Sequence, residues 1–158
     1  MDQEKRMLLQ KYGGIVHLSE PCAVLTERNG AEEQMLQKIA HELKDRDEYL
    51  LLARRGGAGS KEFFRMAAEE ENHARRLKAM WYLTGGQWVS DCPAVPCRLP
   101  QKKAEALRQR YSEECRSAEE YFAMAEAAGG CGGEMLRAMG RDEQRHAETV
   151  LRILERLM

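Results

Sequence analysis

The sequence predicts an all-α protein in which four long helices form a bundle. Three observations support this fold class: the placement of glycine and proline, the spacing of the apolar residues, and the lengths of the connections. Segments rich in helix-forming residues alternate with clusters of Gly and Pro, which interrupt helices. The predicted helices cover roughly residues 31–55, 61–84, 102–128 and 134–157.

The connections between these segments predict how the helices are arranged. Residues 56–60 and 129–133 are rich in glycine and are long enough only for tight turns between antiparallel neighbours. Residues 85–101 contain three prolines and can run the length of a bundle. Short, long and short connections predict two antiparallel helical hairpins joined by one long crossover.

Size and composition limit the classes of function. The 158 residues fit one domain, with a bundle over residues 31–158 and a short N-terminal extension over residues 1–30. The formal net charge is -1 and no basic segment dominates, so we do not expect nucleic acid as a partner. There is no apolar run of the roughly 18 residues that a membrane span needs, and the first residues lack the pattern of a secretory signal. We therefore expect a cytoplasmic protein without membrane contact.

Apolar residues recur three or four positions apart in each predicted helix, which is typical of one buried face. In the second segment the series is Phe63, Met66, Glu70, His73, Leu77 and Met80. In the third segment it is Leu107, Tyr111, Glu114, Ala118, Tyr121 and Ala125. A titratable residue lies in the middle of each stripe, so the sequence predicts charged groups inside the bundle.

These titratable residues belong to a pattern that occurs in both halves of the chain. Each half contains a glutamate followed seven positions later by a tyrosine, and then a glutamate followed three positions later by a histidine. Residues three or seven positions apart lie on the same side of a helix. The members of the pattern are Glu42, Tyr49, Glu70 and His73 in the first half and Glu114, Tyr121, Glu143 and His146 in the second.

Each piece of the pattern, taken alone, also fits a charged surface helix, which is where most glutamates lie. The two halves, however, carry the same pieces in the same order, with 28 residues from Glu42 to Glu70 and 29 from Glu114 to Glu143. Four inward carboxylates and two inward imidazoles form a dinuclear metal site in a helix bundle. The joint pattern therefore favours a metal site over a metal-free structural or partner-binding bundle.

The charges and ligand types point to the same kind of site. Four carboxylates in one core would repel each other without cations, whereas two divalent ions with two neutral imidazoles would bring their net charge to zero. Oxygen and imidazole ligands suit iron or manganese. No Cys-x-x-Cys pair occurs, so the chain encodes no thiolate site of the rubredoxin or zinc-ribbon type.

The segments that carry this pattern resemble the ferritin-like di-iron carboxylate family, on its rubrerythrin and bacterioferritin side. The resemblance covers about residues 31–158, and the matching segments are residues 42–49, 68–74, 114–121 and 142–147. It implies a ferritin-like four-helix bundle.

The resemblance also implies a role for each residue of the pattern. The glutamates of the first and third helices would be terminal ligands, the glutamates of the Glu-x-x-His motifs would bridge two metals, and each histidine would bind one metal. Tyr49 and Tyr121 would lie near the site, behind the ligands. The implied metal ligands are Glu42, Glu70, His73, Glu114, Glu143 and His146.

Two acidic residues are expected to accept a hydrogen bond from the ring nitrogen of each histidine that does not bind metal. A metal-bound imidazole needs a partner for its other N–H. Asp142 and Glu69 each directly precede a predicted bridging glutamate. From the twofold relation between the halves, we expect Asp142 to reach His73 and Glu69 to reach His146.

The resemblance implies a non-haem protein with two iron ions per chain that reacts with hydrogen peroxide or dioxygen, as in rubrerythrin-like defence against oxidative stress. Manganese or a mixed metal pair is the alternative. Since the rubredoxin-like cysteines are absent, electrons would come from another, rubredoxin-like or other, donor protein, and we expect a homodimer. Rubrerythrins carry an additional glutamate three residues after the ligand of the third helix, and in this chain that position is Ser117. Two alternatives to this function are a ferritin-like protein with ferroxidase or iron-handling activity, and a structural or partner-binding helical bundle without metal.

Overall fold

The structure is a computed structural model, and it describes residues 28–90, 92 and 94–158. Four helices and no strands occur in this part of the chain. Most of the predicted N-terminal extension, residues 1–27, lies outside the described residues. The helices are α2 (Arg28–Arg54), α3 (Ser60–Leu83), α4 (Lys103–Ala128) and α5 (Gly130–Glu155).

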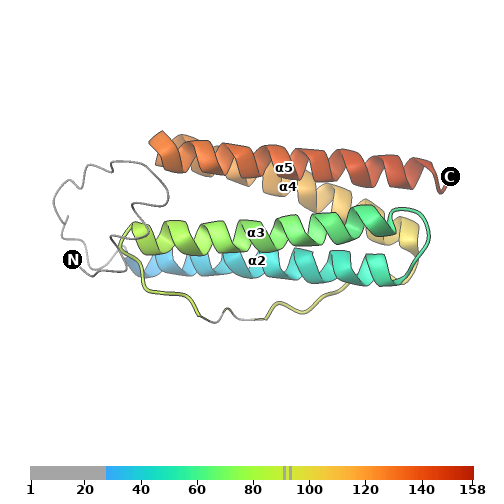
Figure 1. Cartoon of the computed structure of the whole chain (residues 1–158), viewed down its shortest axis with the longest axis horizontal. Coiled ribbons are helices and arrows are strands. Elements are labelled where there is room, and N and C mark those ends of the chain that lie inside the picture. Colours follow the sequence, from blue (N-terminus) through green and yellow to red (C-terminus); the bar gives the residue numbers. More distant parts are fainter. Residues whose placement is uncertain (1–27, 91, 93) are drawn as a thin grey trace.

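The helices form a bundle of two antiparallel hairpins, which confirms the predicted fold class. Figure 1 shows α2 paired with α3 and α4 paired with α5, with the two pairs side by side. The connection between α3 and α4 runs along the outside of α2 (Figure 1), where the thiol of Cys92 donates to the carbonyl of Leu36 at 3.3 Å. Further along, the backbone N–H of Arg98 donates to Glu48 at 3.4 Å. This crossover therefore spans the bundle, as its length predicts.

One helix boundary differs clearly from the sequence prediction. We predict a loop over residues 129–133, but α5 begins at Gly130 and includes most of this glycine run. At Gly133, an added Cβ would lie 2.6 Å from the backbone oxygen of Ala125 in α4. Glycine is therefore used here for close helix packing rather than only for a turn.

The pair Gly132 and Gly133 offers a matched test of this packing. We expect Gly133→Ala to lower the melting temperature, because its Cβ meets a backbone atom that cannot move aside. At Gly132 the nearest heavy atom to an added Cβ is the sulfur of Met80 at 3.9 Å, an ordinary contact. Gly132→Ala should therefore stabilise the chain by up to about 1 kcal/mol through helix propensity. Thermal unfolding of both variants checks the prediction, and equal effects would contradict it.

The apolar core consists of two clusters at the two ends of the bundle. One contains Phe63, Leu107 and Ile153, and the other contains Ile39, Leu77 and Met139. The predicted metal ligands occupy the stretch of each helix between these clusters. Polar groups in this middle layer are consequently closed off at both ends by apolar side chains.

The stripe predicted for the third helix is wrong at one position. Tyr111 is 39% exposed, whereas its neighbour Arg110 is 0% exposed. The guanidinium of Arg110 finds buried carboxylates to pair with, so the charged side chain rather than the aromatic one faces the interior.

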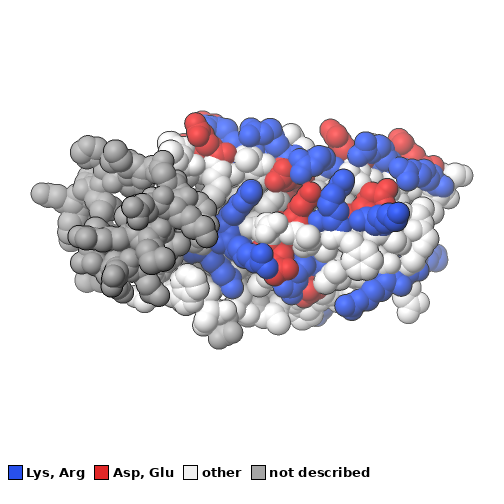
Figure 2. All heavy atoms as spheres, viewed as in Figure 1, with Lys and Arg blue, Asp and Glu red and all other residues white. Residues whose placement is uncertain are grey.

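Charged residues cover the outside of the bundle with both signs intermixed. Figure 2 shows Lys and Arg beside Asp and Glu over the face formed by α3 and α5. None of the described helices contains a stretch that is both long and apolar enough to cross a membrane.

Candidate metal centre

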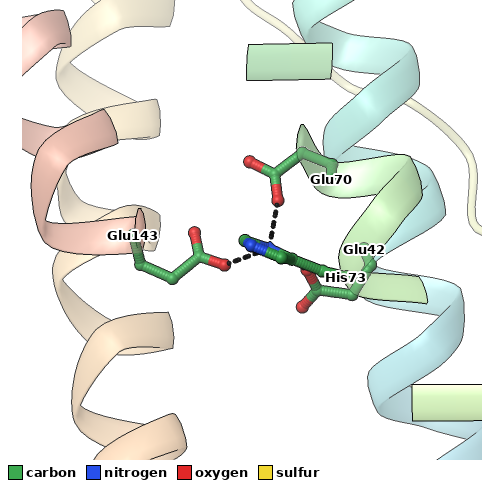
Figure 3. Close-up of side chains that lie close together, drawn as sticks. All are labelled: Glu42, Glu70, His73 and Glu143. Atoms are coloured by element: carbon green, nitrogen blue, oxygen red, sulfur yellow. Dashed lines mark hydrogen bonds and ion pairs between the residues drawn. The ribbon is translucent and has the colours of Figure 1, made fainter. Parts of the chain in front are cut away.

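All six predicted ligands lie in the middle layer of the bundle, and each helix contributes to it. Glu42 comes from α2 and Glu114 from α4, while α3 and α5 each supply a glutamate and a histidine. None of the six residues is more than 1% exposed. Figure 3 shows Glu42, Glu70 and His73 facing Glu143 across the interior.

The six residues form two overlapping groups, each of which could hold one metal ion. Glu70 and Glu143 belong to both groups, as bridging ligands would. Glu42 and His73 complete one group, whereas Glu114 and His146 complete the other. Within each group the ligand atoms lie within 4.8 Å of one another.

Each imidazole turns its Nδ1 atom toward the carboxylates. Nδ1 of His73 lies 3.2 Å from Glu42, 3.1 Å from Glu70 and 3.0 Å from Glu143. Nδ1 of His146 lies 2.9 Å from Glu70, 3.4 Å from Glu114 and 3.5 Å from Glu143. One N–H can form a good hydrogen bond to only one of three such oxygens, so hydrogen bonding alone does not satisfy the cluster.

Several buried atoms of the cluster have close polar neighbours but no well-oriented hydrogen bond among the residues that the structure describes. Such atoms are costly in a protein interior and usually indicate a missing ion or water. All four residues belong to the group completed by Glu114 and His146, and carboxylate oxygen and imidazole nitrogen are both atoms that bind metal ions. These atoms are Glu70 Oε1, Glu114 Oε2, Glu143 Oε1 and His146 Nδ1.

The two contacts predicted behind the histidines are confirmed. Asp142 Oδ2 lies 3.3 Å from Nε2 of His73, and Glu69 Oε2 lies 2.6 Å from Nε2 of His146. The bond to His73 lowers the pKa of Asp142 to about 2, despite partial burial. These contacts leave Nδ1 of each ring free for the interior.

Burial and the surrounding carboxylates act in opposite directions on the imidazoles. Burial alone would lower the pKa of His73, but hydrogen bonds to Asp142, Glu143, Glu42 and Glu70 raise it above its usual value. The pKa of His146 is raised by the equivalent carboxylates. In the metal-free protein, protons on the two imidazoles therefore compensate part of the negative charge.

Both tyrosines of the pattern lie against the cluster. The hydroxyl of Tyr49 donates to Glu114 Oε1 at 2.6 Å. The ring of Tyr121 packs edge-on against His73, with 6.0 Å between the centroids. Burial, followed by the nearby carboxylates, raises the pKa of both phenols, so they stay protonated. Each tyrosine thus lies directly behind the ligand layer, where it is predicted.

Two cations of the centre are missed by the sequence analysis. Lys38 is 8% exposed, and its Nζ lies 3.4 Å from Glu42 Oε1. Arg110 is fully buried, and its Nη2 donates to Glu114 Oε1. Both precede their glutamate by four positions, so a basic residue at this place in both halves is the signal that could have identified them.

These cations change the charge expected for the centre. Arg110 is shared with Asp45, Glu48 and Glu113, and Lys38 is shared with Glu120, so neither cation belongs to the ligand carboxylates alone. The expectation that two divalent ions balance the six ligands counts neither these cations nor their other carboxylate partners.

Comparison of the chain with models of known protein families, with curated proteins and with solved structures gave no match.

Proposed function

We propose that this chain is a ferritin-like metal protein that holds two iron ions and reacts with hydrogen peroxide or dioxygen, as rubrerythrins do. The observation that carries the proposal is the convergence of six buried ligands, in two groups that share Glu70 and Glu143. Two ferrous ions would supply the two electrons needed to reduce an O–O bond. Manganese or a mixed pair would fit the same ligand set.

The protein's own contribution is geometry and shielding. Asp142 and Glu69 fix the orientation of the two imidazoles, and Tyr49 holds one oxygen of Glu114. The apolar clusters on both sides keep bulk water away from the centre. We expect a separate protein, rubredoxin-like or other, to supply electrons, and we expect the bundle to act as a homodimer.

Metal stoichiometry tests this proposal. The chain is purified without metal, titrated anaerobically with Fe(II), and analysed for iron after removal of the unbound ion. We expect about two ions per chain, and each ion at a hundred times its Kd should add about 2.7 kcal/mol to the free energy of unfolding. Saturation at one ion, or no binding, contradicts the dinuclear proposal.

A metal-free bundle is the second candidate, and the buried cations favour it. With both imidazoles protonated, four positive groups contact the four carboxylates, and they reduce the repulsion within the cluster without any metal. The same titration separates the two candidates. Iron handling, the remaining alternative, requires a large hollow assembly, which the native mass of the loaded sample would reveal.

The carboxylates behind the histidines provide a further prediction. We expect Asp142→Asn and Glu69→Gln to weaken metal binding by about 10- to 100-fold, because each removes the charged partner that orients an imidazole. Glu148→Gln is the control, since Glu148 is on α5 but exposed. Anaerobic titration with Co(II) measures all three affinities. Equal affinities for the variants and wild type would show that these contacts do not support a ligand.

A further inference from the structure

The two halves of the bundle repeat an arrangement of cations that goes beyond the ligand set. Lys38 lies on α2 four residues before Glu42, and Arg110 lies on α4 four residues before Glu114. Each cation holds the Oε1 atom of its glutamate. The other oxygen is turned toward the histidines, since Oε2 of Glu42 lies 3.2 Å from His73 and Oε2 of Glu114 lies 3.4 Å from His146.

Each cation also contacts the opposite helix in the same way. Nζ of Lys38 donates to Ser117 on α4 at 2.8 Å, and Nη1 of Arg110 donates to Asp45 on α2 at 2.6 Å. Ser117 and Asp45 occupy equivalent positions in the two halves, three residues after Glu114 and Glu42.

Aromatic contacts complete the repeat. Nζ of Lys38 lies 4.3 Å from the ring centroid of Tyr121, and Cζ of Arg110 lies 4.8 Å from that of Tyr49. Each cation therefore has three equivalent neighbours in the two halves: a glutamate, a polar residue and a tyrosine. Such agreement indicates parts of the centre rather than incidental ion pairs.

We infer that Lys38 and Arg110 are built-in cations of the centre, which neutralise its carboxylates in the metal-free protein and oppose the binding of divalent ions. A positive group beside a ligand carboxylate repels any further positive charge that the carboxylate binds. The same group removes the repulsion among the carboxylates when no metal is present. The part of this inference that concerns metal affinity rests on the proposed function.

The two cations differ in their freedom to move. Arg110 is 0% exposed and is held by Asp45, Glu48, Glu113 and Glu114. Lys38 lines a cavity of about 200 Å³ between α2 and α4, and it has a second partner, Glu120, whose side chain is 45% exposed. An incoming metal can therefore displace Lys38 toward the cavity, whereas Arg110 stays in place.

Removing the charge of Lys38 tests the inference through two effects of opposite sign. Lys38→Met should lower the melting temperature of the metal-free protein, because Glu42 stays buried without its cation. It should also tighten one of the two Co(II) binding steps by about tenfold or more, because Glu42 belongs to only one of the two ligand groups. A residue with a merely structural role would weaken metal binding when replaced.

Arg46→Met is the matched control for affinity. Arg46 is also on α2 and pairs with Asp47, which belongs to none of the groups that could hold a metal ion. The variant should leave the Co(II) affinity near the wild-type value, since the partner of Arg46 is not a ligand carboxylate. Lys38→Gln repeats the test with a polar side chain in case the methionine variant does not fold.

The outcomes separate this inference from the proposed function. If wild type binds Co(II) but neither Lys38 variant binds it more tightly, or if Arg46→Met tightens it equally, the inference is overturned. An unchanged melting temperature of the metal-free Lys38 variants also overturns it. If wild type and every variant bind no Co(II), the proposed function fails, and the metal-free melting temperatures alone decide whether Lys38 neutralises the cluster.

Discussion

Replacing Arg110 with methionine should destabilise the metal-free protein by about 3–5 kcal/mol, the cost of removing one partner from a buried charge network. Arg110 is fully buried and pairs with four carboxylates. Of these, Glu48 and Glu114 have side chains that are at most 1% exposed, so water cannot replace the guanidinium. Chemical denaturation of the metal-free variant measures the loss.

Two further variants show whether the buried network causes the loss. Arg116→Met removes an arginine of the same helix whose side chain is 65% exposed and which pairs with Glu120, so its effect should be below about 1 kcal/mol. Arg110→Lys keeps the charge but loses the multiple contacts of the guanidinium, and it should fall between the two. A loss in Arg110→Met as small as that in Arg116→Met would show that the network contributes little to stability.

The fold could be predicted from the sequence because several independent signals agree. Glycine and proline clusters mark the helix ends, stripes with a helical period mark the buried faces, and the connection lengths fix the pairing. The error at residues 129–133 has a physical reason. The glycines there serve helix contact, since no side chain fits between Gly133 and the oxygen of Ala125, and this requirement depends on a neighbour that the local sequence does not reveal.

The positions of the six clustered residues could be predicted because a repeated pattern identifies them without long-range information. The buried cations share that repetition, since each lies four positions before its glutamate, but their burial does not follow from it. A basic residue four positions before a glutamate is typical of an ion pair on a solvent-exposed helix, so Lys38 and Arg110 resemble surface residues in the sequence. Only the contacts across the bundle, with Ser117 and Asp45 on the opposite helices, show that both lie inside.

Replacing either shared glutamate should abolish binding of both metal ions. Glu70→Gln and Glu143→Gln each remove a carboxylate that belongs to both ligand groups, whereas Glu42→Gln affects only one group and should leave about one ion per chain. Glutamine keeps the size of the side chain, so the bundle should still fold. Metal analysis after anaerobic Co(II) titration distinguishes zero, one and two ions.

The position of Glu143 also predicts that the substitution that abolishes metal binding does not destabilise the metal-free protein. Burial, and then the charges of Glu70 and Glu114, raise the pKa of Glu143 well above its usual value, so an ionised carboxylate is unfavourable there without metal. Glu143→Gln removes this charge, and the metal-free variant should be at least as stable as the metal-free wild type. Glu71→Gln, a neighbour of Glu70 whose side chain is 42% exposed and paired with Arg75, should change neither property. A Glu143→Gln protein that binds two ions with wild-type affinity would refute the bridging role, because the only carboxylate of α5 in either ligand group would then be dispensable.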